Sequence, residues 1–90
     1  MQQRKPQDIK PGDQNYVETR AYILHGEDDV IGGLATVVRV HHDPSAFSEY
    51  VVEVAEHPGC IYNLTYLLEK QDELRDRFGE QRARPDPDLG

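Results

Sequence analysis

A pair of glycines followed by a valine-rich run constrains the fold more than any other feature of this chain. Gly32 and Gly33 precede Leu-Ala-Thr-Val-Val-Arg-Val, and residues 50–54 read Tyr-Val-Val-Glu-Val. Valine-rich runs fit a pleated, largely buried surface, whereas glycine is needed where a strand bends sharply or where two backbones approach closely. The two runs predict an antiparallel pair of strands joined by a polar loop, with Gly33 either at a positive φ or packed against a neighbouring backbone.

A further strand is indicated upstream of the glycines. Pro11-Gly12-Asp13 is a turn signal, because proline presets φ and glycine accepts a positive φ. Small and β-branched residues then alternate along the chain, which predicts a strand over residues 16–24.

The spacing of apolar residues changes to a helical period nearer the C-terminus. Asn63 can cap a helix start through its side-chain oxygen, and Gly79 can end the helix in the left-handed conformation. Between them, apolar residues at helical spacings form one stripe: Leu64, Leu67, Leu68, Leu74 and Phe78. The pattern predicts an amphipathic helix over residues 64–78, with Gln71 inside the stripe and a favourable Glu73–Arg77 pair on the solvent face.

The length of 90 residues leaves room for a single hydrophobic core. We expect one domain over residues 9–79, mainly β with one C-terminal α-helix: a small antiparallel barrel of five strands, or a strongly bent sheet, that carries the helix. Residues 1–8 and 80–90 are polar and contain prolines, so they are expected to be disordered tails whose removal leaves the melting temperature nearly unchanged.

The net charge and the number of cysteines indicate which partners and which cellular location to expect. The net charge of −7 and the pI near 4.9 make nucleic acid an unexpected partner, because affinity for a phosphate backbone comes largely from Lys and Arg. A single cysteine cannot form an intramolecular disulfide, which favours the reducing cytoplasm. No apolar run approaches the length of a membrane span, so we expect neither an export signal nor a membrane anchor.

Four residues resemble a metal-ligand set: His41, His42, His57 and Cys60. The spacing of His57 and Cys60 provides one short pair, but His41 and His42 point to opposite faces of an extended segment. Cys60 could also act as a nucleophile with His57 as its base. Surface histidines and a small buried thiol are the more ordinary interpretation, so we expect no cofactor, no metal and no catalytic residue.

Aromatic and apolar residues suggest two kinds of contact surface. Tyrosine is favoured where a surface is half buried, which suggests a binding face for four tyrosines, although core packing is the default for at least half of them: Tyr16, Tyr22, Tyr50 and Tyr62. The strands and the helix together present more apolar surface than one small core requires, so a homodimer is expected. Its interface would combine the helix stripe with outward strand residues: Leu67, Leu74, Phe78, Val37 and Val51.

Several glycine and valine motifs share the spacing of a known barrel pattern. They are Gly12-Asp13, Val17, Gly32-Gly33, Ala35-Thr36-Val37 and Val52-Glu53-Val54. Together they resemble small bacterial Src-homology-3-like barrels of KOW-like pattern, over residues 9–56. The resemblance implies a ribosome or polymerase contact, an accessory domain of an enzyme such as nitrile hydratase, or a peptide-binding module. The chain differs from the nucleic-acid-binding barrels in being acidic, and from the peptide-binding ones in lacking tryptophan.

These observations favour a non-catalytic protein-interaction or accessory module of the bacterial cytoplasm. One alternative is a small-molecule or metal-binding protein, or an enzyme, built around His57 and Cys60. A third is a nucleic-acid-binding barrel, which would require Lys10, Arg20 and Arg39 to gather on one face.

Overall fold

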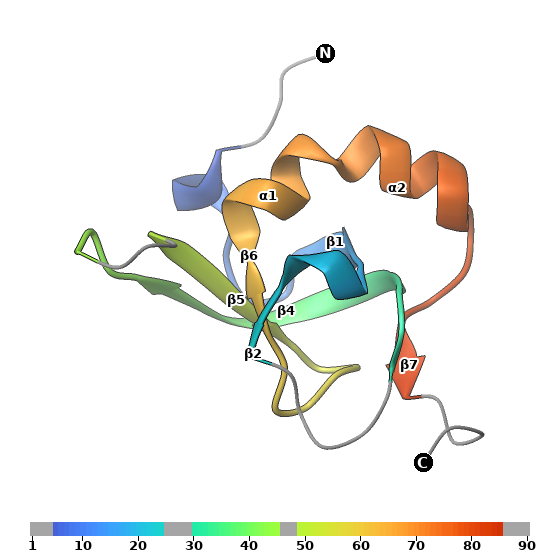
Figure 1. The fold of residues 1–90 in the computed structure, drawn as a ribbon, viewed down its shortest axis with the longest axis horizontal. Helices are drawn as coiled ribbons and strands as arrows, with labels where there is room; N and C mark the ends of the chain where they lie inside the picture. The colour runs from blue at the N-terminus through green and yellow to red at the C-terminus, as the bar shows by residue number, and fades with distance from the viewer. Residues whose placement is uncertain (1–4, 25–29, 46–48, 86–90) are drawn as a thin grey trace.

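A computed structural model describes residues 5–24, 30–45 and 49–85 of the chain. Within these residues, seven strands form two antiparallel sheets, and two consecutive helices follow the sixth strand. The elements in chain order are the 3-10 turn η1 (Pro6–Asp8), β1 (Gln14–Val17), the 3-10 turn η2 (Thr19–Ala21), β2 (Tyr22–Leu24), β3 (Val30–Ile31), β4 (Gly33–His42), β5 (Tyr50–Val54), β6 (Ile61–Asn63), α1 (Leu64–Glu69), α2 (Gln71–Phe78) and β7 (Arg84–Pro85). The expected mainly β fold with a helical region near the C-terminus is confirmed (Figure 1).

The larger sheet has five strands in the order β1-β4-β5-β6-β2, so β1 and β2 are its two edges. These edge strands are consecutive in the chain, and only residues 18–21 separate them. The sheet must therefore curl strongly to bring its two edges to either end of η2. Within the described residues no ladder joins β1 to β2, so the sheet is strongly bent without closing through these strands.

The single strand expected over residues 16–24 is wrong, because the chain turns inside it. Ala21 N–H donates to the carbonyl of Glu18 at 3.1 Å and closes the 3-10 turn η2. The turn sends β1 and β2 to opposite edges of the sheet. Alternation of small and β-branched residues continues through the turn, so the sequence pattern alone does not reveal it.

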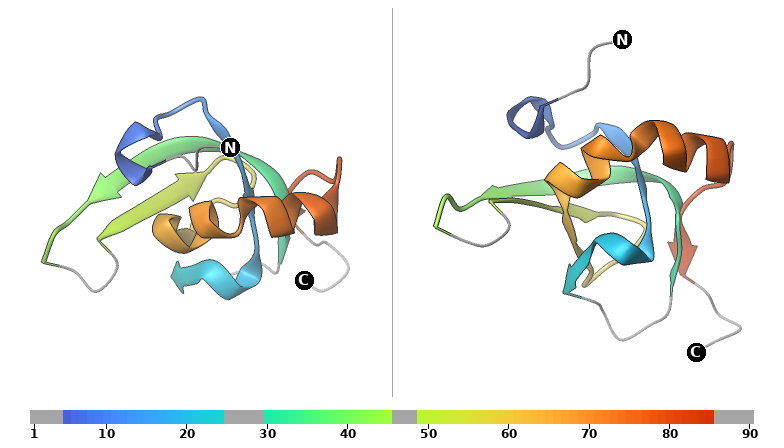
Figure 2. Two further views of the ribbon diagram at one scale, coloured as in Figure 1. Left: turned by 90° about the horizontal axis from the view of Figure 1, so that it is seen from above. Right: turned by 45° about the horizontal axis from the view of Figure 1, so that its top comes forward.

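Strand β4 is long and pairs first with β1 and then with β5. Its first residues, 33–36, pair with β1, and its later residues pair with β5 from Val37 to His42. A register irregularity lies between Val37 and Arg39, and Val38 inside it is 49% exposed. Beyond this point the hairpin of β4 and β5 projects past the helices (Figure 2).

The helices cover one face of the sheet, called the inner face below (Figure 1). The core combines the helix stripe with inward strand residues: Leu64, Leu67, Leu68, Leu74, Val37, Val52, Val54 and Tyr62. Leu67, Leu74 and Val37 are each at most 1% exposed, so in this fold they cannot form the expected dimer interface. The helix stripe is covered by the sheet of its own chain, which removes the reason for assigning it to a second copy.

The helix expected over residues 64–78 is interrupted at Lys70, which separates α1 from α2. At the interruption the Leu67 carbonyl accepts two hydrogen bonds, from Lys70 N–H at 3.1 Å and from the side-chain Nε2 of Gln71 at 2.9 Å. Both expected ends are confirmed. Asn63 Oδ1 accepts from Tyr66 N–H at 3.1 Å, and Gly79 at the C-cap has a φ of 57°.

Residues 81–85, called the C-terminal strap below, contradict the expectation of a disordered tail beginning at residue 80. Leu34 N–H donates to the carbonyl of Gln81, and Ala83 N–H donates to the carbonyl of Leu34, both at 2.9 Å. Ala83 is 3% exposed, and β7 pairs with β3 in the second sheet. A polar segment is ordered here because its backbone completes an open edge of β4. Residues 1–4 and 86–90 of the expected tails lie outside the described residues.

The strap also explains why glycine occupies position 33. Gly33 has a φ of 149°, and a Cβ built there would lie 2.6 Å from the carbonyl oxygen of Gln81. The positive φ and the close approach of a backbone expected from the sequence are both confirmed. The backbone that approaches Gly33 belongs to residues 81–83 of the strap, which are far from Gly33 in the sequence.

No helix in the described part of the chain is both long enough and apolar enough to cross a membrane.

Candidate functional site

The histidines at the end of β4 face opposite sides of the sheet, as expected. His41 Nε2 lies 2.7 Å from a carboxylate oxygen of Glu53. His42 Nε2 lies 2.9 Å from a carboxylate oxygen of Glu49, and its ring stacks on Tyr50 with centroids 4.2 Å apart. Within the described part of the chain, each histidine thus has one carboxylate partner across the β4–β5 hairpin.

His57 and Cys60 are each 1% exposed in the loop between β5 and β6. The Nε2 of His57 lies 3.0 Å from the carbonyl oxygen of Ile31, and Nδ1 lies 2.5 Å from the hydroxyl of Tyr62. A carbonyl can only accept, so Nε2 carries the proton and Nδ1 accepts from Tyr62. Both ring nitrogens are therefore engaged within the fold, and neither is available to a metal or to Cys60.

Tyr62 also packs against a second tyrosine. The ring centroids of Tyr22 and Tyr62 lie 4.9 Å apart. Burial raises the pKa of Tyr62 well above its usual value, and the neighbouring Tyr22 hydroxyl acts in the same direction. Burial also lowers the pKa of His57, so the imidazole is neutral at pH 7.

The four candidate metal ligands do not converge. Within residues 5–24, 30–45 and 49–85, no group of three or more His, Cys, Asp or Glu side chains is arranged to hold a metal ion. His41 and His42 lie on the projecting hairpin, whereas His57 and Cys60 are enclosed in the core. The described residues thus do not bring these four side chains into one metal site.

The four tyrosines proposed as a binding face lie in separate places. Tyr62 is fully buried, with Tyr22 packed beside it. Tyr16 stacks on Phe78 with centroids 6.5 Å apart and donates its hydroxyl to the carbonyl of Gly79. Tyr50 lies on the hairpin against His42. No single surface therefore contains all four rings.

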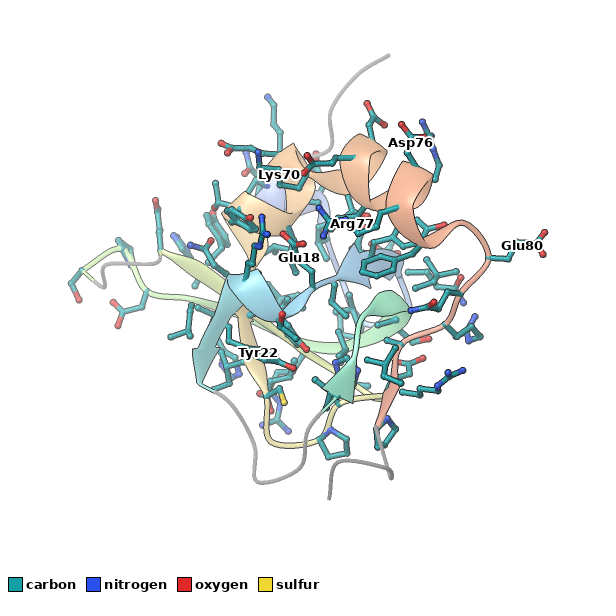
Figure 3. All side chains as sticks on the ribbon, turned by 45° about the vertical axis from the view of Figure 1, so that its right-hand side comes forward. Glu18, Tyr22, Lys70, Asp76, Arg77 and Glu80 are labelled. Carbon is teal, nitrogen blue, oxygen red and sulfur yellow. The ribbon has the colours of Figure 1, made fainter. Side chains whose placement is uncertain are left out.

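A buried carboxylate that sequence reasoning did not single out ties the helices to the sheet. Glu18 is 4% exposed, accepts from Arg77 Nη1 at 2.6 Å and accepts from the hydroxyl of Tyr66 at 2.9 Å. Figure 3 shows Arg77 reaching from α2 toward Glu18, while Asp76 and Glu80 point away from the sheet. Arg77 thus pairs with a strand-end residue rather than with Glu73. The hydrogen bond to Glu18 raises the pKa of Tyr66.

The face of the sheet opposite the helices is called the outer face. Strand register places its residues in two rows: Arg39 beside Glu53, and His41 beside Val51 and Asn63. Alternation along β6 puts Ile61 on the same face as Asn63. Val51 and Ile61 are partly exposed, so an apolar centre lies among charged and polar neighbours.

The charges of the outer face are loosely held. Arg39 Nη1 lies 3.9 Å from Glu53, at the limit of an ion pair, and the Arg39 side chain is 68% exposed. The same Glu53 carboxylate is engaged more closely by His41. Arg39 can therefore turn to an external carboxylate at little cost, because an exposed pair of this kind contributes about 0–1 kcal/mol.

Likeness to known proteins does not assign a function to these residues. Comparison of the chain with protein-family models, with curated proteins and with solved structures finds no match. The function assigned to the chain therefore depends on the chemistry of its own residues.

Proposed function

We propose that this protein is a non-catalytic protein-interaction module that binds its partner through the outer face of β4, β5 and β6. The supporting observation is the contrast between the two faces of one sheet: the helices cover the inner face, and the outer face carries Val51 and Ile61 without a covering element in the described residues. An apolar centre with a polar rim is typical of protein interfaces.

The charge of the surface suggests the chemistry of the partner. Arg39 is the most exposed charged group of the two rows and is only loosely paired, and arginine is enriched among residues that dominate binding energy. The partner is a protein surface that offers a carboxylate to Arg39 beside an apolar contact for Val51. A protein suits this chain better than nucleic acid, because the net charge of −7 opposes a phosphate backbone.

We also propose the finer features of the fold and its setting. The strong curl of the five-stranded sheet supports a Src-homology-3-like barrel, in which η2 joins the two edges and the helices lie over the opening between them. The chain has a single cysteine, Cys60, which is buried, and the lack of a second cysteine for an intramolecular disulfide supports a reducing, cytoplasmic location. The enzyme or metal-binding alternative is less well supported, because His57 uses both ring nitrogens inside the core.

Site-specific photo-crosslinking in the native cell tests the proposed surface. A photoreactive residue at position 41 or 51, which are directly opposite each other on the outer face, should capture the same protein partner. The same residue placed at Thr65, which is exposed on α1, is the control and should capture nothing in common with it. A partner captured equally well from Thr65 contradicts the assignment of the outer face.

Two matched charge reversals test the proposed anchor. Arg39→Glu should abolish capture of that partner, whereas Arg75→Glu, the same change on the exposed side of α2, should leave capture intact. If the captured protein is a second copy of the chain, the predicted homodimer forms through this face and includes Val51 of the expected interface residues. Undiminished capture by Arg39→Glu contradicts the role of Arg39.

A further inference from the structure

The C-terminal strap fills an open position along β4. One edge of β4 near Leu34 bonds to β1, and the other edge bonds to the strap through the N–H and the carbonyl of Leu34. Two residues further on, that second edge continues to β5, where Ala55 N–H donates to the carbonyl of Thr36 at 2.9 Å. The strap and the end of β5 thus follow one another along the same edge.

The N–H of Thr36 falls between these two neighbours and bonds to neither backbone. It donates instead to the Glu56 carboxylate at 2.8 Å, which also accepts from the Thr36 hydroxyl at 3.2 Å. The second oxygen of Glu56 accepts from Arg82 Nη2 of the strap at 3.1 Å. A single carboxylate therefore joins β4 to the strap.

The next residue, His57, holds the other side of the strap. Its Nε2–H donates to the carbonyl of Ile31 in β3, the strand that pairs with β7 at the end of the strap. The backbone of Arg84 in β7 is a second acceptor for the same imidazole. Glu56 and His57 are thus two adjacent titratable residues of one loop. Glu56 contacts the strap at Arg82, and His57 contacts β3 and the β7 part of the strap.

We propose that Glu56 and His57 form an acid-sensitive clasp, which releases the C-terminal strap from β4 at a pH that leaves the core folded. Protonation of His57 removes the Nδ1 lone pair that accepts from Tyr62, and it places a positive charge in a buried site. Protonation of Glu56 removes the charge that holds Arg82. Release of the strap relieves both penalties, because water then solvates the two side chains.

The polar and charged groups in contact with Glu56 and His57 come from several elements packed around them. Around His57 they are Tyr62 from β6, the Ile31 and Arg84 backbones from β3 and β7, and the Glu56 carboxylate. Around Glu56 they are Thr36 from β4 and Arg82 from the strap. No second carboxylate is among them in the described residues.

The direction of both pKa shifts favours release in acid. Burial lowers the pKa of His57 below 6.5, so its contribution is undiminished above pH 6.5 and declines as the pH falls toward the lower folded value. Burial acts to raise the pKa of Glu56, but the bonds from Thr36 and Arg82 outweigh it and hold that pKa below 4.5. The Glu56 contribution is therefore lost only below pH 4.5, after that of His57.

Hydrogen exchange followed by NMR tests this order of events in the full chain. The amides of Leu34 and Ala83 report on the strap, and the amide of Leu74, which donates to the carbonyl of Lys70, reports on the core. Between pH 7.5 and 5.5 the protection factors of the strap amides should fall by about tenfold, since one pH unit below an ordinary histidine pKa gives that change. Protection of Leu74 should stay constant.

Two variants separate the clasp from titration elsewhere. His57→Gln cannot gain a charge and should make strap protection independent of pH over this range, whereas His42→Gln, at an exposed histidine with its own carboxylate partner, should leave the pH dependence unchanged. If His57→Gln does not fold, the NMR titration of the wild-type imidazole should share the midpoint of strap release. A parallel loss of Leu74 protection, or pH dependence that persists in His57→Gln, overturns the proposal.

Discussion

The side-chain amide of Gln71 pairs with both backbone polar groups of Tyr16. Its Oε1 accepts from Tyr16 N–H at 2.8 Å, and its Nε2 donates to the Tyr16 carbonyl at 2.9 Å. Tyr16 lies on β1, an edge of the sheet whose other side bonds to β4. The amide therefore takes the place of one residue of a neighbouring strand, blocks an edge that could otherwise pair with another chain, and fastens α2 to the sheet.

Replacement of Gln71 by alanine should destabilise the fold by about 1–3 kcal/mol, because two backbone groups and the Leu67 carbonyl lose a partner. Urea denaturation measures the change. Gln14→Ala, at an exposed glutamine of the same strand edge, is the control and should change stability by less than about 0.5 kcal/mol. Equal effects of the two substitutions would show that the Gln71 amide is not holding the edge.

Gly33→Ala should destabilise more than Gly12→Ala. Both glycines have positive φ, but a Cβ at Gly12 meets nothing within 4 Å, whereas at Gly33 it overlaps the backbone of residues 81–83. The overlap should add about 1–3 kcal/mol to the conformational cost that the two positions share. Thermal or urea denaturation of both variants measures the difference, and similar losses would mean that the strap does not press on β4. Gly26, in the charged segment between the predicted strands, falls outside the described residues and cannot serve as the comparison.

A chain that ends at Glu80 should be less stable than one that ends at Pro85. The shorter chain loses the bonds to Leu34, the Arg82–Glu56 pair and the buried Ala83, whereas the longer chain keeps every strap contact. The loss should be about 2 kcal/mol or more, which corresponds to a fall of roughly 10 °C in melting temperature for a domain of this size. Equal melting temperatures for the two chains would restore the view that the domain ends near residue 79.

Arg77→Met should destabilise more than Glu18→Gln. The first change leaves a carboxylate that is 4% exposed with Tyr66 as its remaining partner, whereas the second leaves a neutral amide that still accepts from Tyr66 and an arginine that reaches water. We expect about 1–3 kcal/mol for Arg77→Met. Arg75→Met is the matched control on the same helix, since its pair with Asp72 is exposed and should contribute less than about 1 kcal/mol. Urea denaturation measures both losses of stability. A larger loss for Glu18→Gln would contradict the view that the unpaired buried carboxylate is the more costly of the two groups.

Local periodicity was enough to predict the elements that bury one face. The stripe from Leu64 to Phe78 and the run of β5 repeat at 3.6 and 2 residues, and each repeat reports which side faces the core. The run of β4 predicts the strand but not its inner side, because Val37, expected to face outward, is buried. Caps are local too, which is why Asn63 and Gly79 mark the true ends of the helical segment. The signal at Gly33 is local as well, because a positive φ favours glycine at that position.

Contacts between distant segments decided the rest. In the sequence, Gln71 interrupts the apolar stripe of the helix, and His57 is a candidate metal ligand. In the structure, Gln71 bonds to the backbone of Tyr16 in β1, and the two ring nitrogens of His57 bond to Tyr62 and Ile31. The C-terminal strap has almost no apolar pattern, because its backbone rather than its side chains joins β4. Sequence periodicity reports the burial of side chains, whereas backbone pairing, the turn at η2 and the partners of buried polar groups depend on which segments the curled sheet brings together.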